Sequence, residues 1–296
     1  MFSRTLTTLA LIGMLASLTA CTGTTTAMDA AIRQPQATAT ARTDTDLPDH
    51  LVNGDFQYPT VPDDWWIYPW GGNGDVNKRF LTINPGKARA GQGCRLSANG
   101  HDLKGFDRAR FGWASTQDGG SCPGGPGEPG NVELNRESGG NVYGEITADQ
   151  ERTTIYQDIA VTPGAMYTVS LRHASSNRGH VDSMHVLVGA PGRGQPIDMT
   201  RITSNGHGDR AGVTSKLVAT RVGNIANEDK AGQWESYRGT WRCPDGLTVA
   251  RFSFEAVSSS SWSSGNDVDD IAFVKAYPLA YDGNGNTTGN VPKQSK

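Results

Sequence analysis

Aromatic side chains that could bind a sugar ring are concentrated in the segment DDWWIYPW, residues 63–70. The segment holds Trp65, Trp66 and Trp70. Adjacent residues of an extended segment point in opposite directions, so Trp65 and Trp66 cannot both enter one core. An exposed indole stacks on the apolar face of a sugar, while polar groups bind its hydroxyls. We expect these three tryptophans to bind carbohydrate; the alternative is that Trp65 or Trp66 closes one end of the core.

Three further side chains are candidates for the same site. Trp113 stands in Gly- and Ser-rich surroundings, which indicates a position on a loop. Arg172 and His185 fall on the faces of their expected strands that point away from the core, so they could line a concave groove. We do not expect a zinc site built from His173, His180 and His185, because the strand pattern does not make these rings converge.

Catalysis has no clear signature in the sequence. There is no Gly-x-Ser-x-Gly elbow, no His-Glu-x-x-His helix and no P-loop. Glu133, Glu145 and Glu255 lie near expected strands, but their spacing does not set the carboxylate separation that glycoside hydrolysis requires. A binding module without catalysis is therefore the leading interpretation, and a glycoside hydrolase or lyase is the alternative.

The first 20 residues are typical of a secretory signal peptide, because Arg4 precedes the mostly apolar run 6–20, which is too short to span a bilayer. The run ends in LTAC at 18–21, the pattern of a bacterial lipobox. Cys21 is therefore expected to be acylated and to anchor the protein in the membrane. The alternative is an ordinary signal peptide with Cys21 nearby by chance. Residues 21–47 have no hydrophobic period and are expected to form a disordered tether outside the cytoplasm.

Charge and cysteine content restrict the partners and the cross-links. A formal net charge of -3 over 296 residues argues against a nucleic-acid-binding surface. After Cys21, the three remaining cysteines allow at most one disulfide bond in an oxidising compartment. Cys94 with Cys122 would close a Gly/Pro-rich loop, whereas Cys122 with Cys243 would tie that loop to a strand. The sequence does not decide between these pairings.

Short alternating runs bounded by Gly, Pro, Asn and Ser predict an all-β fold for residues 48–278. Five or more half-buried strands indicate two antiparallel sheets packed face to face. In the last strand, Asp269, Ile271 and Phe273 are in phase. Residues 65–145 are expected to form long loops, which either carry function or are tolerated insertions. Strands are expected within residues 155–161, 167–173, 182–192, 232–246, 247–257 and 267–277.

The order of five segments resembles the galactose-binding-like jelly-roll family, which includes xylan- and glucan-binding carbohydrate-binding modules. The segments are LVNGDF, IYQDIAVTPGAMYTVSLRH, W-x-x-Y-x-G-x-W at 234–241, FSFEAV and GNDVDDIAF. The resemblance covers residues 50–277, is nearest to domains of Gram-positive surface proteins, and implies a two-sheet jelly-roll β-sandwich. LAYDGNGNTTGNVP at 279–292 resembles the opening of an internalin-type B repeat. We expect residues 279–296 to be a disordered stub of this β-grasp repeat.

The resemblance also implies a structural calcium ion. In this family the first and last strands lie side by side, and several members hold Ca²⁺ there through carboxylate and carbonyl oxygens. Asp55, Asp269 and Asp270 stand at the matching positions, whereas the family's usual Glu after the Phe is Gln57 here. The alternative is that Asp269 is a buried carboxylate that accepts hydrogen bonds from backbone N–H groups.

Together these features predict a monomeric, lipid-anchored module outside the cytoplasm that binds a glycan or another cell-surface ligand. A protein-binding adhesin is the second alternative.

Overall fold

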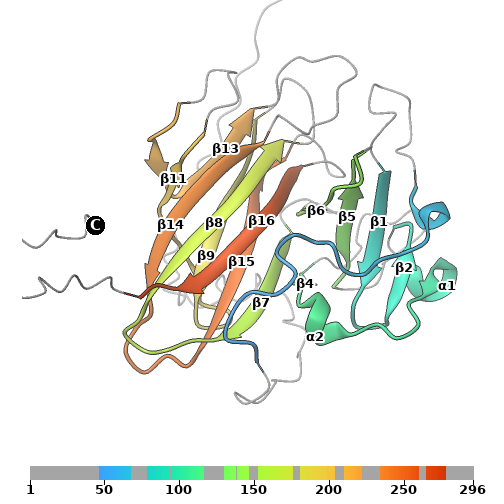
Figure 1. Cartoon of the computed structure of the whole chain (residues 1–296), viewed down its shortest axis with the longest axis horizontal. Helices are drawn as coiled ribbons and strands as arrows, with labels where there is room; N and C mark the ends of the chain where they lie inside the picture. The colour runs from blue at the N-terminus through green and yellow to red at the C-terminus, as the bar shows by residue number, and fades with distance from the viewer. Residues whose placement is uncertain are drawn as a thin grey trace, which may run out of the picture. The chain divides into compact units, whose positions relative to one another are not determined.

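The computed structural model describes residues 47–67, 79–93, 95–116, 130–137, 139–146, 153–175, 181–203, 210–221, 234–259 and 265–277. In these residues two antiparallel β-sheets, of ten and six strands, form a sandwich (Figure 1). The all-β, two-sheet fold class predicted from the sequence is confirmed. Six residues named above lie outside the described residues, namely Arg4, Cys21, Trp70, Cys94, Cys122 and His180.

The larger sheet is centred on three long strands that lie side by side (Figure 1): β14 (Glu235–Arg242), β8 (Met166–Ser175) and β16 (Asn266–Lys275). Beyond β14 the sheet continues through β11 (Met199–Arg201) and β12 (Thr214–Ser215). Beyond β16 it continues through β6 (Val142–Glu145), β5 (Val132–Arg136), β1 (Arg79–Asn84), β2 (Arg89–Gly91) and β3 (His101–Asp102).

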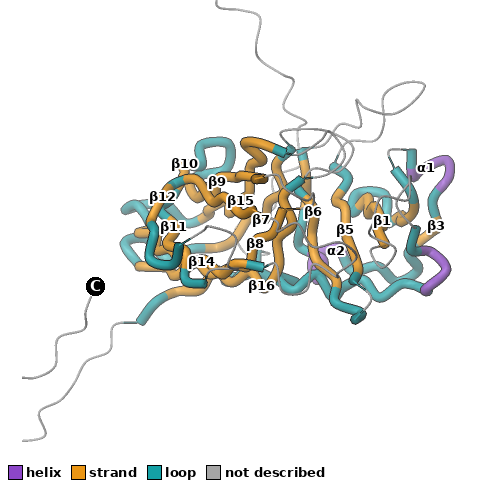
Figure 2. Tube along the Cα trace, turned by 90° about the horizontal axis from the view of Figure 1, so that it is seen from above, coloured by secondary structure: helices purple, strands orange, loops and turns teal. Residues whose placement is uncertain are grey.

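The smaller sheet forms the second layer, which Figure 2 shows above β8, β14 and β16. Its order is β10 (Gln195–Pro196), β9 (Val181–Gly189), β15 (Val249–Ser258), β7 (Thr154–Ala160) and β4 (Ala114–Ser115), with β13 (Leu217–Arg221) also paired to β9. The described helices are short: α1 (Leu96–Asn99), α2 (Arg108–Phe111) and a 3-10 turn at Asp63–Trp65. Within the described part of the chain, no helix is long and apolar enough to cross a membrane.

Alternating side chains build the core between the sheets, as the sequence predicts. On β8, the side chains of Tyr167, Val169 and Leu171 are at most 2% exposed, whereas Met166 and Thr168 are exposed. Because successive residues of a strand point to opposite faces, one face of β8 lies in the core and the other points outward. The smaller sheet contributes the opposite wall of the core from β9 and β15, through Met184, Val186, Val188, Phe252 and Phe254.

The alternation changes phase within β16. Asp270 and Ile271 both stand opposite the single residue Leu171 of β8. This two-against-one pairing is a β-bulge, which interrupts the alternation of faces. As a result Asp269 lies on the outer face of the sheet, while Phe273 lies in the core. The expectation that Asp269 and Phe273 share a face was wrong, because the extra residue of the bulge could not be seen without the pairing.

Residues 79–145 contain sheet strands that the sequence analysis did not predict. β1, β5 and β6 extend the larger sheet, and they contribute Leu81, Ile83, Val132 and Leu134 to the core. These strands have only four to six residues each. Such short runs give little periodicity, so the region was interpreted as loops.

The N-terminal segment LVNGDFQYP lies against the last strand, as the resemblance implied. The backbone N–H of Ile271 donates to the Gly54 carbonyl oxygen at 3.0 Å. Phe56 is completely buried, and its ring stacks on Trp113 with a centroid distance of 5.1 Å. A Cβ atom on Gly144 of β6 would lie 2.6 Å from the Phe56 ring. Glycine is therefore required where the segment crosses the sheet.

Cys243 is a buried free thiol that follows β14. Its sulfur lies 3.4 Å from the carbonyl oxygen of Leu247 and 3.6 Å from that of Pro244. Burial raises the pKa of this thiol above its ordinary value. Of the two disulfide pairings left open by the sequence, the one that uses Cys243 is therefore not formed.

Candidate functional site

The outer face of the larger sheet is polar and yet largely buried. On β5 and β6, the positions between the core residues are Glu133, Asn135, Tyr143 and Glu145, none of them more than 6% exposed. Polar groups are rarely buried without partners, so this surface is not an ordinary solvated one. We name it the polar face and define it by Thr82, Glu133, Asn135, Tyr143, Glu145, Asp267, Asp269, Arg172, Ala174 and Trp234.

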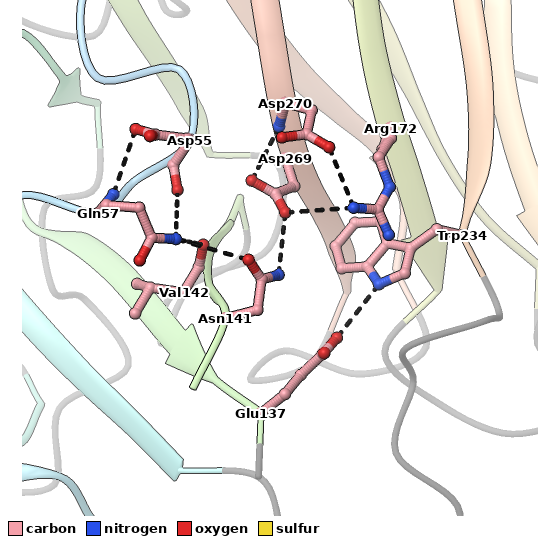
Figure 3. Close-up of polar contacts among 9 residues, drawn as sticks. All are labelled: Asp55, Gln57, Glu137, Asn141, Val142, Arg172, Trp234, Asp269 and Asp270. Carbon is pink, nitrogen blue, oxygen red and sulfur yellow. Dashed lines mark hydrogen bonds and ion pairs between the residues drawn. The ribbon is translucent and has the colours of Figure 1, made fainter. Parts of the chain in front are cut away.

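Arg172 is the partly exposed side chain of the polar face, and we call its position the rim; it lies beside Asp270 and Trp234 (Figure 3). Its guanidinium carbon is 4.9 Å from the centroid of the Trp234 ring, and its Nη1 donates to Asp270 at 3.0 Å. The indole N–H of Trp234 donates to Glu137 at 3.2 Å, and the Tyr143 ring packs edge-on against the indole at 5.1 Å. The side chain of Arg172 is 33% exposed, whereas Trp234 is 8% exposed. The flat group presented to solvent is therefore the guanidinium, backed by the indole.

The β-bulge brings two adjacent carboxylates to Arg172. In a regular strand, neighbouring residues point to opposite faces, so only one of them could approach the guanidinium. Here Nη1 of Arg172 is 3.0 Å from the Asp270 carboxylate and 3.8 Å from that of Asp269. Asp270 is exposed, whereas Asp269 is buried. The bulge thus creates one solvent-facing and one buried acidic group around a single cation.

Asp269 is held by two hydrogen bonds besides its proximity to Arg172. Its Oδ2 accepts from the side-chain amide of Asn141 at 3.0 Å, and its Oδ1 accepts from the backbone N–H of Asp270 at 2.8 Å (Figure 3). Burial opposes the charged form and raises the pKa of this carboxyl to about 6, against the opposing effects of these hydrogen bonds and of Arg172. Asp269 therefore titrates much nearer to neutrality than an ordinary aspartate.

Gln57 connects the N-terminal segment to the same network. Its side-chain amide donates to the carbonyl oxygens of Asp55 at 2.9 Å and Val142 at 3.1 Å, and lies 3.5 Å from the Asn141 side-chain oxygen (Figure 3). The Asp55 carboxylate accepts a long hydrogen bond, 3.4 Å, from the Gln57 backbone N–H. Gln57, which stands where the family's usual Glu would be, therefore acts here as a hydrogen-bond donor.

The three carboxylates expected to bind calcium do not fit that role well. Arg172 already supplies a positive charge to Asp269 and Asp270, while Asp55 is exposed and bonded to its own segment. Within the described ranges, no group of three or more His, Cys, Asp or Glu side chains could hold a metal ion. Calcium at Asp55, Asp269 and Asp270 stays a prediction that only a binding measurement can test.

The tryptophans predicted as sugar platforms lie in different environments. Trp65 is half-buried and stacks on His101 at 4.3 Å, and Trp66 is 7% exposed beneath the Arg136 guanidinium at 5.0 Å. Trp113 is a core residue with 1% exposure, so it is not carried on an exposed loop. Trp65 is the only one of these three rings with substantial exposure.

Arg172 and His185 do not line one groove. Arg172 points outward from β8 in the larger sheet, whereas His185 points outward from β9 in the smaller sheet. The Nδ1 atom of His185 lies 3.4 Å from the carboxylate of Glu255 on the neighbouring strand β15. The two candidates therefore belong to opposite faces of the sandwich.

Four residues around Arg172 were missed as site residues in the sequence, namely Trp234, Glu137, Asn141 and Tyr143. One of them had a usable signal. Trp234 stands three residues before the core residue Tyr237, and an odd spacing in a strand places two side chains on opposite faces. The other three lie in and beside strands that the sequence analysis did not predict.

Comparisons with known proteins give distant structural similarity and no sequence family. No family model and no curated protein matches the chain. A structure titled "CBM4 structure and function" is 15% identical, with a TM-score of 0.29, and the match covers 76% of this chain and 98% of that one. A CBM22 xylan-binding domain from Paenibacillus barcinonensis is 11% identical, with coverages of 57% and 88% and a TM-score of 0.29. The K3 cleaved adhesin domain of Lys-gingipain from Porphyromonas gingivalis is 10% identical, with coverages of 55% and 91% and a TM-score of 0.27.

Proposed function

We propose that this protein is a carbohydrate-binding module that contacts its ligand through the rim of the polar face at Arg172. The observation that carries the proposal is the partly exposed guanidinium of Arg172, held between Trp234 and Asp270. A guanidinium presents a rigid fork of donors, and a carboxylate presents acceptors. A sugar hydroxyl both donates and accepts, so it can bond to either group.

Preorganisation supports this choice of surface. Arg172 is fixed from below by the Trp234 ring and from the side by the Asp270 carboxylate, and Asp269 is fixed by Asn141. Groups that are already ordered lose less conformational entropy when a ligand binds. A flat cation with adjacent acceptors therefore offers a ready surface for a flexible, weakly binding ligand such as a glycan.

The location of the protein is part of the proposal. The LTAC sequence that ends at Cys21 supports acylation of that cysteine, and the apolar run before it supports export. An acylated Cys21 would hold the β-sandwich at the outer surface of the cytoplasmic membrane. Such an arrangement suits a module that captures extracellular glycan.

A glycan array followed by calorimetry with the best ligand tests the function. Arg172→Gln should weaken binding at least about tenfold, because it removes an ionised donor, whose hydrogen bonds are roughly twice as strong as those of a neutral one. Arg251→Gln is a matched control on the smaller sheet. Arg251 also covers an aromatic ring, Tyr156, at 3.8 Å and pairs with an aspartate, Asp158, at 2.7 Å.

The proposal predicts that binding falls in Arg172→Gln and is retained in Arg251→Gln. Equal affinity of both variants and the wild type would remove Arg172 from the site. Failure of every glycan to bind would favour a protein ligand, as an adhesin requires. Release of reducing ends from a bound glycan would instead indicate a hydrolase.

A further inference from the structure

A row of carboxylates crosses the polar face away from Arg172. Glu133 of β5 stands directly opposite Glu145 of β6, which stands directly opposite Asp267 of β16. All three are at most 6% exposed. Residues directly opposite each other in neighbouring strands have Cβ atoms about 4.5–5.5 Å apart, and like charges at that spacing repel. The sheet therefore concentrates acidic oxygen atoms in a buried environment.

Two buried neutral oxygens border this row and have no hydrogen-bond partner among the described residues. Thr82 of β1 stands directly opposite Glu133, and Asn135 follows Glu133 on the same face of β5. Both residues are completely buried. The side-chain amide N–H of Asn135 donates to Glu145 at 2.9 Å, which fixes the amide beside the carboxylates. For Thr82 Oγ1 and Asn135 Oδ1, no hydrogen-bond partner is found in the described structure.

An unsatisfied buried oxygen is rare, and each one reduces stability substantially. Thr82 Oγ1 and Asn135 Oδ1 therefore point to a bound species that is attracted to oxygen. Water would satisfy a hydroxyl and an amide oxygen. A cation would satisfy them and would also interact favourably with the adjacent carboxylates.

We propose that Thr82, Glu133, Asn135 and Glu145 bind a divalent cation of the calcium class. Ca²⁺ takes six to eight oxygen ligands at about 2.3–2.6 Å and accepts hydroxyl, amide and carboxylate oxygens together. Strands about 4.8 Å apart place side-chain oxygens of neighbouring strands within reach of one ion between them. Two carboxylates and two neutral oxygens form the protein part of the site, and water completes it. Zinc is disfavoured because it prefers nitrogen and sulfur ligands.

This site is separate from the carboxylates at Arg172, and it does not depend on a glycan ligand. Arg172 places a positive charge 3.8 Å from Asp269, whereas the side chains of Thr82 and Asn135 beside Glu133 and Glu145 are uncharged. Calcium bound beside Glu133 and Glu145 can therefore be distinguished by substitution from calcium bound at the carboxylates next to Arg172. Thr82→Val removes one oxygen and keeps the shape of the side chain, and Glu133→Gln removes one charge. Asp269→Asn removes one charge from the carboxylates next to Arg172 and serves as the comparison.

The test is calorimetric titration of the full chain with Ca²⁺ alone, after treatment with EDTA. The wild type should bind Ca²⁺. A free Ca²⁺ concentration about a hundredfold above its Kd should raise the Tm by about 5–10 °C. Thr82→Val and Glu133→Gln should weaken Ca²⁺ binding at least about tenfold, because ligand number and charge set calcium affinity. Asp269→Asn should keep the wild-type affinity.

Thr82→Val also provides a check that does not rely on a charged substitution. In EDTA its Tm should be no lower than that of the wild type, because the variant loses a buried hydroxyl without a partner. If Glu133→Gln does not fold, Thr82→Val therefore still decides the question. The proposal is overturned if the wild type shows neither heat nor a change in Tm with Ca²⁺. It is also overturned if only Asp269→Asn loses binding.

Discussion

The buried carboxyl of Asp269 should make the stability of the protein fall as the pH rises from about 4 to above 6. Burial raises its pKa from the ordinary aspartate value of 3.8 to about 6, so between these pH values the folded protein binds more protons than the unfolded chain. Stability decreases with pH wherever the folded state holds more protons. The contribution of Asp269 is therefore complete below the unfolded pKa and is lost as the pH rises through the folded pKa.

The magnitude follows from the shift. A shift of about two pKa units corresponds to about 3 kcal/mol, since each unit contributes about 1.4 kcal/mol. Titration is incomplete at both ends of an experimental range, so about 2.5 kcal/mol should be lost between about pH 4 and about pH 7.5. Other groups titrate in the same range, so the total stability of the wild type does not isolate this effect.

The assay is a comparison of the wild type with Asp269→Asn by urea denaturation at several pH values, with EDTA present. The variant cannot ionise at this position, so the difference in free energy of unfolding should move by about 2.5 kcal/mol in favour of the variant as the pH rises. A constant difference would show that the pKa is not raised. If the difference moves in favour of the wild type as the pH rises, Arg172 and Asn141 lower the pKa of Asp269 more than burial raises it.

Arg172→Gln is the control. It should increase the pH dependence of stability, because it removes the positive charge that lowers the pKa of Asp269.

Three further predictions concern the core, the N-terminal segment and the anchor. Trp113→Ala should lower the free energy of unfolding by about 3–5 kcal/mol in urea denaturation, because the ring is buried between Phe56 and Phe254; a loss below 1 kcal/mol, on the scale of a surface substitution, would contradict its place in the core. Gly144→Ala should cost about 1–3 kcal/mol, since the added methyl overlaps the Phe56 ring; an unchanged Tm would show that the ring can move aside. Cys21→Ser should abolish incorporation of labelled palmitate and release the protein from the membrane fraction, whereas a wild type that is already soluble would refute the anchor.

The core strands could be predicted because their alternation is strict and local. Tyr167, Val169 and Leu171 show it on β8, and Phe252 and Phe254 show it on β15. In each strand the hydrophobic residues recur at every second position, which requires no knowledge of the partner strand. The two-residue hydrophobic period therefore identified the all-β fold class and the strand faces of both sheets that form the core.

The polar face could not be predicted in the same way. A polar residue between two core residues indicates a solvated position, so Glu133 and Asn135 had no signal that they are buried. The contact of Arg172 with two adjacent carboxylates depends on a bulge, and a bulge is defined only by the pairing of two strands. The sequence identified Arg172, Asp269 and Asp270 as candidates, but it did not place them in contact.

The bulge in β16 also bears on how the Arg172 site could arise during evolution. Asp270 is the supernumerary residue: if it were deleted, Ile271 alone would stand opposite Leu171, and the pairing on both sides would be unchanged. A single-codon deletion would thus restore a regular strand with the same pairing to β8, and a single-codon insertion would recreate the second carboxylate. At this position the acidic group can change while the pairing of β16 with β8 stays the same. Proteins that share the sandwich can therefore gain or lose this acidic group by one insertion or deletion, and the contact that must adjust is the one between the Ile271 N–H and the Gly54 carbonyl oxygen.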